Sequence, residues 1–71
     1  MKNLKDFSEK VEKYLAERRG KMIFITFWFK DGEIVSVGFD EKKNVIYSNG
    51  VTRYVDFIIK HKGRILKKIL L

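Results

Sequence analysis

Hydrophobic residues between positions 3 and 20 recur mostly at intervals of three or four residues, which is the spacing of one face of an α-helix. Asn3 is a suitable N-cap, and Gly20 is a suitable residue to follow the last helical turn. On the opposite face, acidic residues stand four positions before basic ones, an arrangement that stabilises a solvated helix. The pattern predicts a helix over residues 3–19, with an apolar face formed by Leu4, Phe7, Val11, Tyr14 and Leu15.

The next segment has the composition of a β-hairpin. Residues 22–29 are rich in β-branched and aromatic side chains and contain neither Gly nor Pro, so they predict a central strand. Asp31 and Gly32 suit a two-residue type I′ turn, because both central positions of that turn have positive φ angles. Residues 33–39 then form the returning strand, and residues 45–47 add a short third strand after a polar loop.

The last part of the chain fits a helix better than a strand. Its hydrophobic residues lie on one side of a helix that begins between Ser48 and Thr52. Lys62 falls within that apolar side and Gly63 disfavours a helix interior, so we expect a break near His61 that leaves one kinked helix or two short ones. The predicted apolar side consists of Val51, Tyr54, Val55, Ile58, Ile59, Ile65, Leu66, Ile69 and Leu70.

These elements define the predicted fold. We expect a single α+β domain over residues 1–71, in the order α-β-β-β-α, with both helices on one face of a three-stranded antiparallel sheet. An alternative places a second hairpin turn at Asn49 and Gly50 and a fourth strand over residues 51–55. A chain of 71 residues has room for a small core only, so a dimer interface or a ligand would add to its stability.

Basic residues are concentrated at the two ends of the chain. The formal net charge is +7, and residues 51–71 contain six Lys or Arg against one acid, whereas residues 22–50 contain three against four. Such an excess favours nucleic acid, an anionic membrane or an acidic protein as partner, or serves solubility alone. The absence of Cys fits a reducing, cytoplasmic location. Neither a membrane-spanning apolar run nor a signal-peptide pattern is present, so we do not expect a membrane partner.

No set of residues in the sequence suits catalysis or metal binding. His61 is the single histidine, and it stands among basic residues with no acid nearby in sequence to orient it. The acidic residues of the middle segment fall in two separate turns, and the five glycines are scattered singly instead of forming a phosphate-binding loop. We therefore expect a protein that is not an enzyme and that uses neither a cofactor nor a metal.

Basic side chains of the C-terminal helix form the first candidate site. On a continuous helix five of them lie opposite the apolar side or flank that position, with Phe57 next to them. A row of this kind matches the phosphate backbone of DNA or RNA, which it would bind by releasing counterions. An ordinary solvated helix face, or residues 65–71 lying on an anionic membrane, would give the same pattern. The predicted nucleic-acid-binding residues are Arg53, Lys60, Arg64, Lys67 and Lys68.

The sheet face away from the helices is the second candidate site. Side chains alternate along a strand, so Phe24 and Trp28 share the face opposite the core, together with Ile34 of the next strand. A large exposed apolar patch usually marks an interaction site. We predict that Phe24, Trp28 and Ile34 form the interface of a homodimer. The alternatives are stacking of single-stranded bases, a protein partner, or coverage of this face by the C-terminal segment.

The sequence as a whole predicts a small, basic, non-catalytic protein with a regulatory role, which binds nucleic acid through its terminal helices and forms a homodimer. The alternative is an adaptor or inhibitor, of the kind that viruses and mobile elements encode, which binds another protein through the aromatic sheet face.

Overall fold

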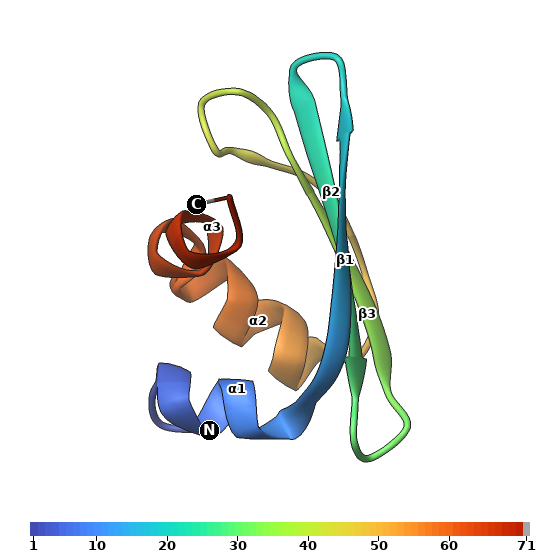
Figure 1. The fold of residues 1–71 in the computed structure, drawn as a ribbon, viewed down its shortest axis with the longest axis vertical. Helices are drawn as coiled ribbons and strands as arrows, with labels where there is room; N and C mark the ends of the chain where they lie inside the picture. The colour runs from blue at the N-terminus through green and yellow to red at the C-terminus, as the bar shows by residue number, and fades with distance from the viewer. Residues whose placement is uncertain (71) are drawn as a thin grey trace.

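The protein consists of two layers, a four-stranded antiparallel sheet and a group of three helices that covers one face of it (Figure 1). The computed structural model describes residues 1–70, and side chains over residues 1–69. The strands lie in chain order across the sheet, so each strand after the first pairs with the one before it. Along the chain the elements are α1 (Leu4–Lys10), β1 (Val11–Arg19), β2 (Met22–Phe29), β3 (Ile34–Phe39), β4 (Val45–Asn49), α2 (Thr52–Lys60) and α3 (Lys62–Leu70).

The α+β class is confirmed, and so is the placement of the helices on one face of an antiparallel sheet. The predicted number of elements is wrong, because the structure has three helices and four strands where two and three were expected. The second half of the predicted N-terminal helix forms the strand β1, and the predicted C-terminal helix consists of two helices, α2 and α3.

The predicted N-terminal helix is correct only in its first half. Asn3 caps α1 as expected, since its side-chain oxygen accepts a hydrogen bond from the backbone N–H of Asp6 at 2.9 Å. The helix then stops at Lys10, and the residues that were assigned to its second half form β1. Pairing with β2 gives the backbone groups along the edge of that strand hydrogen-bond partners, which outweighs the local preference for a helix.

Gly20 has the positive φ angle expected of a glycine after a helix, but its place in the fold is different. Its φ angle is 61°, and together with Lys21 it forms the loop between Arg19 and Met22, which face each other across β1 and β2. Glycine at the first central position of a two-residue loop, followed by a residue with negative φ, is typical of a type II′ turn.

The hairpin of β2 and β3 is confirmed, and its turn differs from the predicted two-residue form. The N–H of Phe29 donates to the carbonyl of Glu33 at 2.9 Å, and the N–H of Gly32 donates to the carbonyl of Phe29 at 3.0 Å. The loop therefore has three residues, of which Gly32 alone has a positive φ angle. Asp31 instead accepts a hydrogen bond from the N–H of Glu33 with its carboxylate, at 3.0 Å.

The C-terminal part begins as a helix at Thr52, which confirms the helical prediction over the alternative fourth strand of residues 51–55. The expected break at His61 is also present, and it produces two helices that run in different directions (Figure 1). The side chains of residues 70 and 71, which include the last position of the predicted apolar side, lie outside the described part of the structure.

The core lies between the sheet and the helices. Inward-facing side chains of β2 and β3 pack against α2 and α3, while Phe7 of α1 stacks on Phe57 with ring centroids 5.2 Å apart. Phe57 is therefore a core residue and not part of the exposed basic side of the helix, because Phe7 of α1 covers its ring. The buried residues are Phe7, Ile25, Phe27, Phe29, Val35, Val37, Phe39, Tyr54, Val55, Phe57, Ile58, Ile65 and Leu66.

Candidate functional site

The structure places Phe24, Trp28 and Ile34 on the sheet face that the helices leave uncovered. Trp28 lies directly opposite Ile34 in the pairing of β2 with β3, and Phe24 lies opposite Gly38. Ile34 is 55% exposed, and Phe24 and Trp28 are half-buried. We call this surface the open face.

The open face is less uniformly apolar than the sequence predicts. Its centre is a hydrogen bond between the hydroxyls of Thr26 and Ser36, which are 3.0 Å apart on adjacent strands. This polar pair lies between Trp28 and Phe24 along β2. Phe24 meets Tyr47 of β4 edge-on, with ring centroids 6.3 Å apart.

Trp28 and Phe24 each have a basic side chain of β1 over the ring. The ammonium of Lys13 lies 5.0 Å from the centroid of Trp28, and the guanidinium of Arg19 lies 5.2 Å from the centroid of Phe24. Cations over aromatic faces at this distance are stabilised by the quadrupole of the ring. Sequence reasoning missed both basic residues because it placed them on a helix, and the uniformly exposed side chains of β1 give no alternating pattern that would have indicated a strand.

The basic residues of the C-terminal helices divide into two groups. Lys60, Arg64, Lys67 and Lys68 are exposed at the end of α2 and along α3, and we call them the α3 basic surface. No acidic residue follows Asp56 in the sequence. Within the described part of the chain, none of the four has a carboxylate within ion-pair distance. Their positive charge is therefore not locally neutralised.

Arg53 does not belong to this surface. It lies in the first turn of α2, where its guanidinium is 3.1 Å from the carboxylate of Asp31 and 4.7 Å from the ring centroid of Tyr54. The row that Arg53 would form with the other four residues on a continuous helix is not present, because the bend at His61 turns α3 away from α2 and because Asp31 neutralises Arg53.

Asp31 joins the turn between β2 and β3 to the start of α2. The hydroxyl of Tyr54 donates to the Asp31 carboxylate at 2.5 Å, and this hydrogen bond is the main reason why the pKa of Asp31 lies below its usual value. The same bond, together with burial of the ring, raises the pKa of Tyr54. Tyr54 is buried and stacks on Phe29 with ring centroids 3.8 Å apart. The Asp31–Tyr54 hydrogen bond therefore connects the turn between β2 and β3 to the core and has a structural role.

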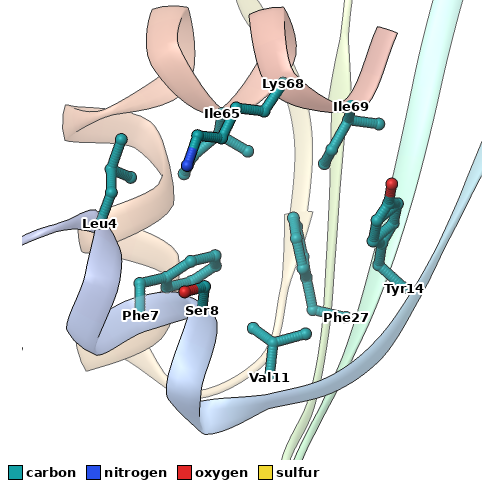
Figure 2. Close-up of a pocket in the computed structure, with 9 residues that line it drawn as sticks. All are labelled: Leu4, Phe7, Ser8, Val11, Tyr14, Phe27, Ile65, Lys68 and Ile69. Carbon is teal, nitrogen blue, oxygen red and sulfur yellow. The ribbon is translucent and has the colours of Figure 1, made fainter. Parts of the chain in front are cut away.

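An apolar pocket of about 270 Å³ lies between α1, α3 and the first two strands (Figure 2). Phe7 and Phe27 form its wall. Tyr14 of β1, which is 48% exposed, lies on the helix side of the sheet and lines the pocket at the β1 edge. Lys68 extends from α3 across the pocket toward α1, so the stem of this predicted nucleic-acid-binding residue covers apolar surface (Figure 2).

The single histidine packs against the core. The ring of His61 lies on that of Phe57 with centroids 4.3 Å apart, and the residue ends α2. Within residues 1–70, no three His, Asp or Glu side chains come together as ligands for a metal ion. None of the described helices has the length and apolar character needed to cross a membrane.

Comparison of the chain with protein-family models, with curated proteins and with solved structures found no match.

Proposed function

We propose that the protein binds nucleic acid through the α3 basic surface. The observation that carries this proposal is the arrangement of Arg64, Lys67 and Lys68, which are exposed at helical spacings of three and four residues on a helix without any acidic residue. Side chains at these spacings share one face of a helix and can approach the same phosphate backbone.

Binding of this kind is mainly electrostatic. Each phosphate that a Lys or Arg neutralises releases counterions from duplex DNA, so the logarithm of the affinity falls by about 0.9 per contact for each tenfold increase in salt. The four residues of the α3 basic surface include no Asn or Gln, the side chains that pair with adenine, and all four Lys and Arg side chains suit contacts with phosphates. We therefore expect weak sequence specificity and a strong dependence on salt.

The same helix is poorly placed to lie on a membrane. An interfacial helix inserts its apolar side into the lipid, and here Ile65 and Leu66 of that side are buried in the protein core. The basic side of α3 is what remains exposed to a partner, and it matches a phosphate backbone better than a lipid layer.

The test is a charge reversal on α3. Arg64→Glu/Lys67→Glu should lower the affinity for duplex DNA and RNA by more than about tenfold at low salt, because attraction becomes repulsion at two phosphate contacts. Fluorescence anisotropy over a salt series measures both the affinity and its salt slope.

A matched control variant has the same net charge as Arg64→Glu/Lys67→Glu but leaves α3 unchanged. Lys30→Glu/Lys42→Glu changes two exposed lysines in hairpin loops and should weaken binding less. An equal loss in both variants would show that net charge, and not the α3 basic surface, governs binding. Absence of binding by the parent protein at low salt would refute the proposal.

The open face supports a second candidate function, that of a module that binds another protein. Ile34 and Leu15 are more than half exposed on this face, at 55% and 51%, next to Trp28. Surface aromatic residues with apolar neighbours are frequent binding hot spots. A specific protein partner should be lost on Trp28→Glu and retained on Arg64→Glu/Lys67→Glu, and isothermal titration calorimetry with the purified pair measures this difference.

A further inference from the structure

The strand β1 presents an unusually long free edge. It has nine residues, and among residues 1–70 it pairs only with β2, on its other side. All its residues except Val11 are exposed. Edge strands of this length are usually protected, because their unpaired N–H and C=O groups form a template for another strand.

The geometry of the hairpin tells which backbone groups point outward. Arg19 and Met22 close a two-residue loop, and such a closing pair exchanges hydrogen bonds. Hydrogen-bonded and non-hydrogen-bonded pairs alternate along an antiparallel ladder. Tyr14, Ala16 and Arg18 therefore direct their N–H and C=O groups away from β2, toward the free edge.

The sequence of β1 is complementary to itself in one antiparallel register. When Leu15 faces Leu15 of a second copy, Lys13 lies opposite Glu17 on both sides of the twofold axis, in the part of β1 that follows the β-bulge between Val11 and Lys13. Residues that face each other in an antiparallel pair must point their backbone groups the same way, so the next possible registers are shifted by two residues. Those registers place Leu15 opposite Lys13 or opposite Glu17, and both lose the Lys13–Glu17 ion pairs.

We propose that the protein is a homodimer in which the two β1 strands pair antiparallel about Leu15 and join the two four-stranded sheets into one. The twofold axis of such a pair is perpendicular to the sheet, so the helices of both copies lie on the same side. The dimer covers Tyr14 on the helix side and Leu15 on the open face, which are 48% and 51% exposed in one chain. This proposal depends on the sequence and geometry of β1 and not on nucleic-acid binding.

Charge reversal on β1 tests the register by sedimentation equilibrium. Lys13→Glu and Glu17→Lys should each weaken dimerisation by about tenfold, because the twofold axis turns two attractive pairs into two repulsive ones. The double variant Lys13→Glu/Glu17→Lys restores opposite charges across the axis and should restore the dimer. Both positions lie on an exposed strand, and circular dichroism checks that each of the three variants is folded.

A proline at the free edge tests the pairing itself. Ala16→Pro removes an N–H that points away from β2, so it should abolish the dimer and leave the β1–β2 ladder intact. Ile34→Glu is the comparison, since it introduces a charge into the open face on β3, two strands away from the free edge.

Three outcomes would overturn the proposal. They are a monomeric parent protein at about 100 μM, a double variant that remains as weak as the single ones, and a dimer that is lost on Ile34→Glu but survives Ala16→Pro. The last outcome would assign the interface to the open face.

Discussion

Two glycines show how differently single positions constrain this chain. Gly50 has a φ angle of 136°, and a Cβ atom there would lie 2.8 Å from Cγ2 of Val35 and 3.0 Å from its Cα. Gly63 lies in α3, and a Cβ atom there would meet nothing within 4 Å. The first glycine is required by the close approach of β3, whereas the second is only a weak point in a helix.

We therefore predict opposite effects for the same substitution. Gly50→Ala should lower the free energy of unfolding by roughly 1–3 kcal/mol, because it combines a disfavoured backbone conformation with a clash against backbone atoms. Gly63→Ala should raise it by about 0.5–1 kcal/mol, because alanine loses less entropy in a helix. Urea denaturation measures both, and a stabilising Gly50→Ala would contradict the geometry of this turn.

At the scale of elements, α1 is too short to be stable by itself. It has seven residues, and helices of this length depend on packing. Phe7 supplies that packing, since its ring stacks on Phe57 and meets Phe27 and Phe29 edge-on at 5.4 and 5.7 Å. The helix therefore exists because one aromatic side chain enters the core.

Phe7→Ala should lower the free energy of unfolding by roughly 3–5 kcal/mol, because it leaves a cavity among three phenylalanine rings. Amide hydrogen exchange should show that α1 loses protection before the sheet does. Ser8→Ala is the control, since Ser8 is exposed and bonds only the carbonyl of Lys5. Equal effects of the two variants would show that α1 does not depend on its core contact.

The contrast between β1 and β2 explains which elements could be predicted from the sequence. β2 contains alternating core residues and strand-forming side chains, so local pattern and final structure agree. The residues of β1 favour a helix. Their pairing partner, β2, follows a turn at Gly20, and a glycine at that position is equally typical of the end of a helix. Because β1 is exposed on both faces, no buried stripe distinguishes the two structures.

At the scale of the whole molecule, the candidate sites could also be predicted only where they depend on local sequence pattern. The faces of β2 and β3 follow from alternation, so the open face could be predicted. The roles of Arg53 and Phe57 could not, because they depend on Asp31 and Phe7, which come from distant parts of the chain. Nucleic-acid binding, dimerisation and the absence of catalysis remain predictions.

The two layers of the molecule are joined at one end by Asp31, Tyr54 and Arg53, and this link should make stability depend on pH. The low pKa of Asp31 means that the folded protein favours the carboxylate over the acid. The stabilisation is present above the usual pKa of an aspartate and is lost as the pH falls through the lower pKa of the folded state. At alkaline pH the sign is opposite for Tyr54, whose raised pKa favours the neutral phenol and whose contribution is lost as the pH rises through that pKa.

Asp31→Asn isolates the acid-side effect, because the amide keeps the shape of the side chain and does not titrate. The variant should melt at a lower temperature than the parent protein at pH 7, where the parent has an ionised carboxylate facing Tyr54 and Arg53. The difference between the two melting temperatures should shrink as the pH falls through the lowered pKa of Asp31, because the carboxyl group then becomes protonated in the parent as well. Thermal unfolding followed by circular dichroism across this range measures the difference directly. A difference that stayed constant from neutral to acid pH would show that the Asp31 carboxylate does not hold the turn between β2 and β3 against α2.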